Sequence, residues 1–555
     1  MPLRHFELLA FEDIMLLQPG LLEEGSLHWL LSRYPDLLFP YWLFVGWKGE
    51  SLLGRPAWPA ESLMGLLLLR YSEVGTTRVG SLRRAKHDAQ WRAALRLPWH
   101  VNPPHEKTMR EFEAFLKTDH PVVDESRIVL LFEHWTRLGL EGGVVGDEVL
   151  AVIDSTPMWC FGAVLGTVNL LGEGLRSLAK RWARARKVPL TTVAAEWDAP
   201  LVLAKSTKGY FVGTDWSDAT ARSGVLDQLA ELVTRCVGVV TAGLDGVSKN
   251  KLLPLARRSR NLLRVVDEDL ETAEDGTIRV VRRTTSDRLI SHTDPDAQHF
   301  RKSKSKVCQG FKLHVLGDAL SGLIIALSVT PGGAHDSTQA HPLIKRAKAL
   351  YDDLREVLAD AAYGGMPVRR EVYDGVGVTL LAPPIKSSHK GLGKVDFTID
   401  FAKMVMTCPG GVSTSMWKPA KHEGQITQAF IWSKGSEFEC GCRESCPVHR
   451  PREKTKKEEK TKREVPPTRR LVLHAQEQEL RALRADWERP EVRQRYRQRS
   501  QGERLINEMT RRGARRAYAW GLDNAQLQAY CIAAVNNLKL LARKLAKDAT
   551  HQLAA

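Results

Sequence analysis

Three carboxylates stand at places in the sequence where catalysis or metal binding could use them. Asp154 closes the apolar run "DEVLAVI", and Asp360 closes the run "REVLA" ahead of "AAYGG". Short runs rich in Val, Leu and Ile predict buried strands, here with a carboxylate at the C-terminal end, and Pro157 is expected to break the first of them. Glu503 lies in the arginine-rich segment "YRQRSQGERLINEMTRR", where polar residues at steps of three or four predict one face of a helix.

Each of these carboxylates also has an ordinary structural alternative. Asp154 and Asp360 could each cap a turn or the start of a helix. Arg499 lies four residues before Glu503, so the two could form a surface ion pair worth a few tenths of a kcal/mol. A catalytic role for Glu503 therefore requires that other parts of the chain supply partners for its carboxylate.

Carboxylates gathered by the fold would form a site for hard divalent cations. Mg²⁺ and Mn²⁺ prefer oxygen ligands, bind through few carboxylates and keep positions for water and phosphate. Two such ions about 4 Å apart can activate a nucleophile and stabilise the leaving oxygen in phosphoryl transfer. Asp294 and Asp336 are further candidate ligands, whereas capping is expected for His335.

The segments between the carboxylates alternate strand and helix patterns. The stretch "CQGFKLHVLGDALSGLIIALSVTPGGAHD" predicts a hairpin with strands through Val315 and Val329 and a turn at "GDALSG". "HDSTQAHPLIKRAKALYDDL" predicts a helix and "GVTLLAPP" one more strand. This order is typical of an α/β fold, in which a sheet can bring distant strand ends together.

Composition shifts divide the chain into four expected regions. They are an all-α N-terminal domain at 1–145, a first part of the catalytic core at 146–389 with a helical insertion at about 157–300, a cysteine-containing insertion and charged linker at 390–490, and the rest of the core at 491–555. In the first region "TMREFEAFLK" predicts a helix opened by Thr108. The cluster Arg83, Arg84, Lys86 and Arg92 suits DNA binding or a solvated basic face equally well.

The charge balance favours a polyanionic partner. The 555 residues include 81 Lys and Arg against 65 Asp and Glu, a formal net charge of +16. No apolar run reaches the roughly 18 to 20 residues of a membrane-spanning helix, and the start "MPLRHFELLAFED" lacks a signal-peptide core. Nucleic acid is therefore the first candidate partner, with a membrane surface as the rival, and the chain is expected to stay in the cytoplasm.

The eight cysteines are too few for a disulfide scaffold, but four of them cluster. Cys408, Cys440, Cys442 and Cys446 could hold a structural Zn²⁺, with His449 or His422 replacing one of them. The spacing C-x-C-x3-C matches the usual zinc knuckle imperfectly, so reduced, partly buried thiols remain the alternative.

Taken together, these motifs resemble the Asp-Asp-Glu (DDE) transposases of bacterial insertion sequences. "IDST" around Asp154, "LADAAYGG" around Asp360 and the spacing Tyr496-x2-Arg499-x3-Glu503 carry the likeness, and they do so in the family's order. The chain looks most like the insertion-sequence-four superfamily and its insertion sequence eleven-eighty-two-like branch. Further matching stretches are "GRPAWPAESLMGLLLLRY", "VTPGGAHD", "CGCRESC" and "AAVNNLKLLARKL".

The resemblance implies a ribonuclease H-like catalytic domain, a mixed sheet flanked by helices, in which Asp154, Asp360 and Glu503 bind two Mg²⁺ or Mn²⁺ ions. It also implies that the nucleic acid is double-stranded DNA and that Tyr496 and Arg499 contact the phosphates of the transposon ends. The basic setting of Glu503 adds Arg495, Arg497 and Arg511 as candidates for DNA contact, and Lys312 is a further one. The family usually has a Lys seven residues after the Glu, where this chain has Thr510. That departure puts one phosphate contact in question, with Arg511 as a substitute.

The expected function is therefore a transposase that binds the terminal inverted repeats of its element, cleaves DNA and joins the freed 3′-hydroxyl to target DNA. Synapsis of two ends favours a homodimer acting at the bacterial nucleoid. The alternatives are a catalytically silent DNA-binding protein and a nuclease of the same fold without strand transfer.

Overall fold

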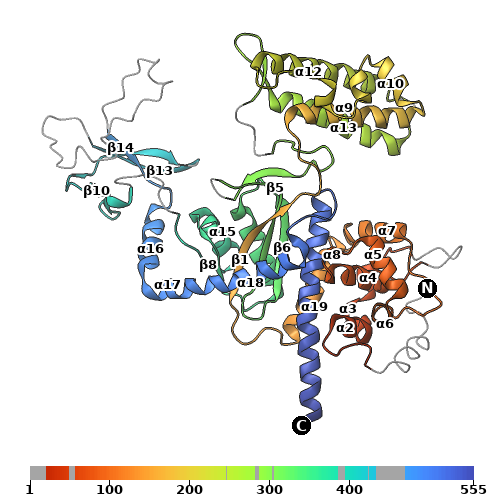
Figure 1. Ribbon diagram of the computed structural model, residues 1–555. Coiled ribbons are helices and arrows are strands. Elements are labelled where there is room, and N and C mark those ends of the chain that lie inside the picture. Colours follow the sequence, from red (N-terminus) through yellow and green to blue (C-terminus); the bar gives the residue numbers. More distant parts are fainter. Residues whose placement is uncertain are drawn as a thin grey trace. The chain divides into compact units, whose positions relative to one another are not determined.

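The computed structural model describes residues 20–48, 57–245, 247–281, 287–302, 305–385, 394–422, 424–432 and 469–554 (Figure 1). The chain divides into two compact units, the first formed by Met1–Leu354 with Gln501–Ala555 and the second by Arg355–Ser500. Both mix helices and strands, so the α/β fold class expected from the sequence is confirmed. Each unit has hydrophobic core clusters of its own.

The first unit is built on antiparallel strands around a long central one. Strand β5 (Val307–Asp318) pairs with β1 (Ala151–Trp159), β4 (Gln298–Arg301) and β6 (Ile324–Pro331). Strands β5 and β6 form the hairpin predicted from the sequence. Its turn is fixed by Asp318, whose carboxylate accepts hydrogen bonds from the backbone N–H groups of Leu320 and Ser321.

Strand β1 does not end at Asp154, as the sequence pattern suggested, but continues through Pro157 to Trp159. The N–H of Trp159 donates to Arg515 O at 2.9 Å, on the side of β1 away from β5. Pro157 lies two residues earlier, and residues two apart on a strand direct their backbone N–H groups to the same side. An N–H at position 157 would therefore also point away from β5. The proline therefore removes no hydrogen bond from the β1–β5 ladder.

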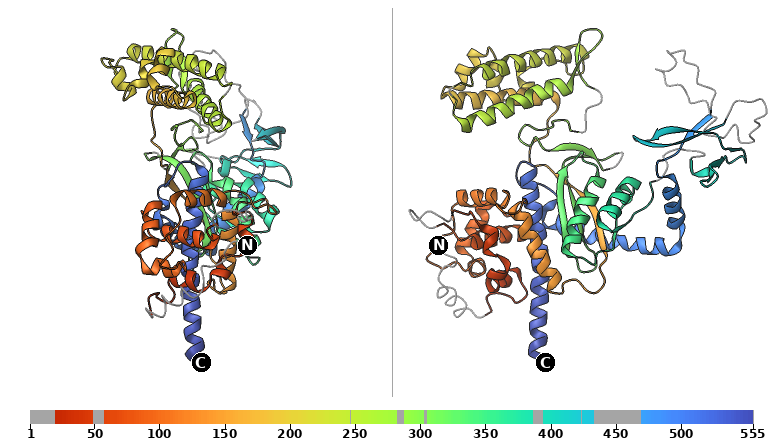
Figure 2. Two further views of the ribbon diagram at one scale, coloured as in Figure 1. Left: turned by 90° about the vertical axis from the view of Figure 1, so that its right-hand side faces the viewer. Right: turned by 180° about the vertical axis from the view of Figure 1, so that it is seen from behind.

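Helices cover this sheet. The long helix α19 (Leu522–Ala554) packs against β6 and against α8 (Arg127–Glu141), as both Figures 1 and 2 show. Asn537 of α19 bonds both backbone groups of Ile324, at 3.0 Å to the N–H and 2.7 Å to the carbonyl, and the Tyr530 hydroxyl donates to Leu327 O. Helix α14 (Ala340–Leu350) also packs on β6. No helix within the described residues is both long and apolar enough to cross a membrane.

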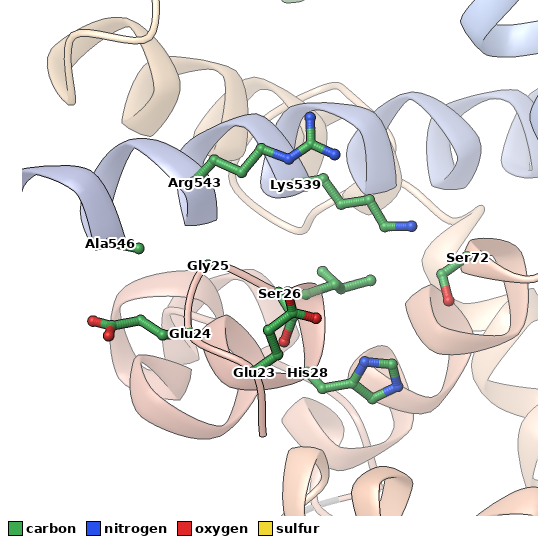
Figure 3. A pocket seen from close by; sticks show the side chains of 10 residues that line it. Glu23, Glu24, Gly25, Ser26, His28, Ser72, Lys539, Arg543 and Ala546 are labelled. Carbon is green, nitrogen blue, oxygen red and sulfur yellow. The ribbon is translucent and has the colours of Figure 1, made fainter. Parts of the chain in front are cut away.

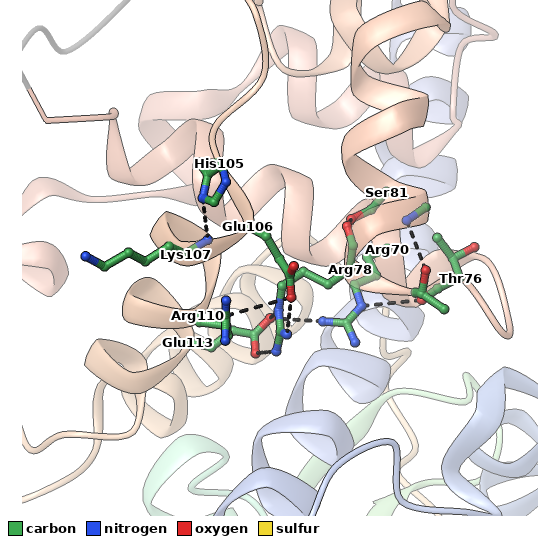
Figure 4. Close-up of polar contacts among 11 residues, drawn as sticks. Arg70, Thr76, Arg78, Ser81, His105, Glu106, Lys107, Arg110 and Glu113 are labelled. Atoms are coloured by element: carbon green, nitrogen blue, oxygen red, sulfur yellow. Dashed lines mark hydrogen bonds and ion pairs between the residues drawn. The ribbon is translucent and has the colours of Figure 1, made fainter. Parts of the chain in front are cut away.

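The N-terminal region is helical, and a buried ion-pair network links its helices. Its helices are α2 (Leu27–Arg33), α3 (Pro35–Leu38), α4 (Ala60–Ser72), α5 (Arg78–His87), α6 (Ala89–Ala94) and α7 (Glu106–Leu116). The Glu113 carboxylate on α7 accepts hydrogen bonds from Arg70 at 2.9 Å and Arg78 at 2.6 Å (Figure 4). Helix α7 begins before the predicted Thr108, because the His105 side chain caps it by accepting from Lys107 N.

A helical insertion between β1 and β4 has its own core. Its helices are α9 (Thr167–Arg186), α10 (Leu190–Glu196), α11 (Thr207–Tyr210), α12 (Ala219–Ala242) and α13 (Lys249–Asp269), followed by the small hairpin of β2 (Leu270–Thr272) and β3 (Ile278–Val280). Leucines, valines and tryptophans of α9, α10, α12 and α13 form the core. The insertion is thus a small helical bundle.

The second unit contains a parallel strand pair and two small antiparallel sheets. Strands β7 (Glu356–Leu358) and β8 (Thr379–Leu381) are parallel and joined through α15 (Met366–Val376), which confirms the two strands predicted here. The small sheets are β9 (Thr398–Asp400), β10 (Val405–Thr407) and β11 (Ser413–Thr414), and β12 (Trp417–His422), β13 (Gln425–Trp432) and β14 (Arg469–Val472). Helices α16 (Glu477–Glu488) and α17 (Pro490–Arg497) follow.

Candidate active site

Asp154 lies in the middle of β1, opposite Val315 of β5. It is half-buried, and its Oδ1 accepts a hydrogen bond from Ser155 N at 2.8 Å. Because side chains alternate along a strand, Asp154 shares a face of the sheet with Val152, while Ser155 points to the other face. The ladder on either side holds the Asp154 backbone in place.

Glu503 is the first residue of α18 (Glu503–Met509), which packs against β1 and β5 through the buried Leu505 and Met509. Gly502 lies so close to β1 that a Cβ atom on it would stand 2.4 Å from Val152 Cγ1. Asp154 is two residues from Val152, about 6.6 Å along the strand. The backbone just before Glu503 therefore lies against the face of β1 that carries Asp154.

The continuous helix predicted through Tyr496, Arg499 and Glu503 is interrupted. Helix α17 ends at Arg497, a 3₁₀ turn spans Gln498–Gly502, and α18 starts a new helix at Glu503. The spacing that would set Arg499 one α-helical turn before Glu503 is thus broken. The close approach of Gly502 to β1 accounts for the break, since a regular helix with side chains could not come this near.

We expect Gly502→Ala to destabilise the protein by about 1–3 kcal/mol, because the added methyl would overlap Val152. The double variant Gly502→Ala, Val152→Ala should recover part of the lost stability, because it removes the Val152 methyl groups that the added Cβ would overlap. Chemical denaturation measures both changes. The matched control is Gly146→Ala, where an added Cβ meets nothing within 4 Å. If Gly502→Ala were as stable as that control, the close packing of α18 on β1 would be wrong.

On the opposite face of the sheet, Ser155 belongs to a polar network. Its hydroxyl donates to Asp336 Oδ2 at 2.7 Å, and Lys312 Nζ donates to Asp336 Oδ1 at 2.7 Å and to Ala334 O at 2.8 Å. The side chains of Lys312 and Asp336 are each only 17% exposed. This network ties the strand position next to Asp154 to the segment that follows β6.

The charges in this network are fixed by their surroundings. Burial alone would raise the pKa of Asp336, but hydrogen bonds from Lys312 and Ser155 outweigh it and hold that pKa below its usual value. His314 lies opposite Ser155 and bonds Thr330 Oγ1 at 3.0 Å. Burial lowers the pKa of His314 to about 4, so the imidazole is neutral at pH 7. The Lys312–Asp336 pair is therefore the charged centre of the network.

Asp360 belongs to the second unit and follows β7, as predicted. It caps the short 3₁₀ turn Ala361–Tyr363, with its Oδ1 accepting from Ala362 N at 2.9 Å. Asp360 therefore has the capping role that was the structural alternative for it. Only its Oδ1 is used for the cap, so Oδ2 can still bind another group. A site that unites Asp360 with Asp154 and Glu503 is a proposal, because the third carboxylate lies in a different unit.

The other acidic candidates have structural roles. Asp294 is buried and accepts hydrogen bonds from Gly521 N at 2.9 Å and Gly162 N at 3.4 Å, so it joins two loops. Asp336 points away from the Asp154 face, as its bond to Ser155 shows. The capping role expected for His335 is confirmed, since its Nδ1 accepts from Ser337 N.

The candidate DNA-contacting residues are distributed over both units. In the second unit Arg497 is exposed, Arg495 pairs with Glu356 at 2.9 Å, and Tyr496 packs edge-on against Trp487. Arg499 is half-buried. In the first unit Arg511 is exposed and Lys312 is engaged with Asp336.

Further cations interact between the segment that follows α18 and helix α19. A hollow of about 420 Å³ between the start of α2 and helix α19 is lined by Lys539, Arg543 and His28 (Figure 3). Burial lowers the pKa of Lys539, and the positive charges of Arg512 and Arg543 lower it further. Three cations from the segment after α18 and from α19 are thus close enough to repel one another.

The cysteine prediction can be followed at one position. Cys408 is buried in the small core of the second unit beside Met406 and Phe430. Cys440, Cys442, Cys446 and His449 lie outside the described residues, as does the charged segment up to residue 468. Within the described part of the chain, no group of three or more His, Cys, Asp or Glu side chains is gathered as a metal site would need.

Two features of the site were missed from the sequence. Gly502, which lets α18 approach β1, immediately precedes the glutamate, and a glycine in an otherwise polar helical pattern was a readable sign of close packing. The Ser155–Asp336 bond joins residues 181 apart, and only the resemblance of "IDST" and "VTPGGAHD" to family motifs marked both partners.

In a comparison with known families, residues 272–538 match the family described as Transposase DDE domain. The matched stretch contains Asp360 and Glu503 and begins after Asp154. The match supports a DDE transposase, a DNA-cleaving and DNA-transferring enzyme. Neither the curated proteins nor the solved structures gave a significant match.

Proposed function

From the transposase DDE domain in residues 272–538, we propose that this protein is the transposase of a bacterial insertion sequence, of the insertion-sequence-four superfamily and its eleven-eighty-two-like branch. It binds the terminal inverted repeats, cleaves there and joins the 3′-hydroxyl ends to target DNA. Asp154, Asp360 and Glu503 are its catalytic carboxylates, on a ribonuclease H-like core. The observation that supports the proposal is the close approach of Gly502, the residue before Glu503, to Val152 on the face of β1 that carries Asp154.

The donor set fits the divalent cations that such enzymes use. Asp154 and Glu503 offer hard carboxylate oxygens from a paired strand and from a helix anchored by Leu505 and Met509. With Asp360 they would hold two Mg²⁺ ions, which supply an activated nucleophile and stabilisation of the leaving oxygen. The protein's own part is to keep the two carboxylates at a fixed separation.

Cations near Glu503 would offset the repulsion between the carboxylates and DNA. Arg497 and Arg511 are exposed and can contact phosphates. At the position of the missing family Lys, we propose that Arg511, which is exposed and follows Thr510 directly, takes over the phosphate contact. The all-α N-terminal region would bind DNA as well, and two ends held in synapsis would require a homodimer at the nucleoid.

A strand-transfer assay tests the function. Purified protein is incubated with Mg²⁺, a linear DNA carrying the element's own ends, and a supercoiled plasmid. We expect the ends to be cut and joined to the plasmid. Cutting without joining would indicate a nuclease of the same fold, and end-specific binding without cutting would indicate a silent DNA-binding protein. Either result would contradict the proposal.

A further inference from the structure

The helical insertion buries an arginine that has no counter-charge. Arg258 lies on α13 with only 7% of its surface exposed. Its Nη1 has no hydrogen-bond partner within the described structure. No carboxylate among the described residues contributes to its electrostatic surroundings either. A buried guanidinium in this state is unusual, because such groups are normally paired and hydrogen-bonded.

The packing of α13 on α9 places a second arginine beside it. The helices run antiparallel, because Leu262 meets Gly174 near one end and Lys251 Nζ donates to Arg184 O near the other. Between these two contacts Arg258 faces the stretch of α9 just before Arg181. Arg181 is then within about one helical turn, 5.4 Å along the axis.

The neighbouring groups add positive charge and no negative charge. Arg181 and Arg257 are both exposed, so they mark the solvent side of the α9–α13 seam. Burial, together with the positive charges of Arg181 and Arg257, lowers the pKa of Arg258 to about 10. The group nonetheless stays protonated at neutral pH. The nearby His292 is neutral there, because burial and the charge of Arg258 lower its pKa to about 4.

A protonated guanidinium that is largely buried and has no counter-charge destabilises the folded state unless an anion joins it. Phosphate oxygens are the natural partners of a guanidinium fork, which can donate two parallel hydrogen bonds to them. Two exposed arginines at the same seam would widen the contact along a chain of phosphates. With a net charge of +16, the protein as a whole attracts such a polyanion.

We propose that the seam between α9 and α13 is a DNA-backbone site, in which Arg258, with Arg181 and Arg257 at its rim, binds a phosphodiester of the DNA. The site is independent of base sequence and lies outside the proposed catalytic carboxylates. This inference rests on the proposed function only in taking DNA as the polyanion. It gives the helical insertion a role in holding the DNA substrate.

The test compares Arg258→Met with Arg260→Met in the full chain. Arg260 lies two residues along α13, about 200° around the helix, and is exposed on the other side. Binding to a short duplex of arbitrary sequence is measured without metal over a range of salt concentrations. We expect Arg258→Met to lower the slope of log K against log salt by about one unit, and Arg260→Met to leave it unchanged. The melting temperature of the DNA-free protein should hold or rise in Arg258→Met.

An unchanged salt slope in Arg258→Met would overturn the proposal, and so would an equal loss in both variants. Should Arg258→Met fold poorly, the exposed Arg181→Met takes its place, with the same expectation for the slope. Inorganic phosphate is tested as a second probe. If it stabilises the wild type and not Arg258→Met while the DNA slope is unchanged, the site holds free phosphate and the DNA assignment fails. A protein that shows the expected slopes yet cuts no DNA would contradict the transposase proposal and leave this site standing.

Discussion

Replacing Glu503 by glutamine should lower the rate of DNA cleavage by several orders of magnitude and leave folding and DNA binding intact. Glutamine keeps the shape and helix propensity of the side chain and removes the charge that a metal ion needs. A carboxylate that fixes a catalytic metal contributes to the transition state far more than a surface ion pair contributes to stability. Cleavage of DNA bearing the element's ends, with Mg²⁺, measures the effect.

Glu508→Gln is the matched control for Glu503→Gln. Glu508 lies on the same short helix and pairs with Arg512 at 3.2 Å, so its loss should cost no more than about 1 kcal/mol. If Glu503→Gln cleaved within about tenfold of the wild type, a change worth roughly 1.4 kcal/mol in the barrier, Glu503 would not be a catalytic ligand.

Asp336→Ala should destabilise the protein by about 3 kcal/mol or more, the range measured when one partner of a buried ion pair is removed. The change leaves the Lys312 ammonium largely buried, with Ala334 O as its remaining partner, and leaves the Ser155 hydroxyl without its acceptor. Urea unfolding measures the free energy. Because Ser155 adjoins Asp154, the same variant should also weaken cleavage.

Two further variants separate the ion pair from a general sensitivity to mutation. Asp336→Leu combined with Lys312→Met removes both charges and should recover most of the stability, since no unpaired charge then stays inside. Asp352→Ala breaks a pair with Lys348 in which the aspartate is 97% exposed, and it should change little. A loss in Asp336→Ala no greater than that in Asp352→Ala would show that the network contributes little.

The parts of the fold that follow from local patterns could be predicted from the sequence. The hairpin of β5 and β6 has alternating or continuous apolar runs around a turn rich in Gly, Asp and Ser, and such signals act within a few residues. The strand before Asp360 and the capping by His335 are local in the same sense. The strand that carries Asp154 was predicted, but its end was wrong, because β1 runs on through Pro157 to Trp159 and Asp154 lies within it.

The parts that depend on long-range packing could not be predicted. A polar periodicity continued across residues 496 to 510, and Gly502 was a local sign of close packing, but its partner Val152 lies 350 positions earlier in the chain and could not be identified from the pattern. Lys312 was one of the candidates for DNA contact, and only the fold reveals its bond to Asp336. The burial of Arg258 likewise could not be predicted from the sequence, because it results from the packing of α9 on α13.

The two hydrogen bonds from Asn537 to Ile324 have a consequence for solubility. In the described part of the chain, β6 pairs with β5 along one edge, and its other edge would present unpaired N–H and carbonyl groups to any passing strand. Exposed edges of this kind recruit strands from other molecules and lead to aggregates. The Asn537 amide and the Tyr530 hydroxyl occupy these groups as a neighbouring peptide would. A chain that is cut before α19, by a protease or by a premature stop codon, would therefore self-associate as well as lose its core.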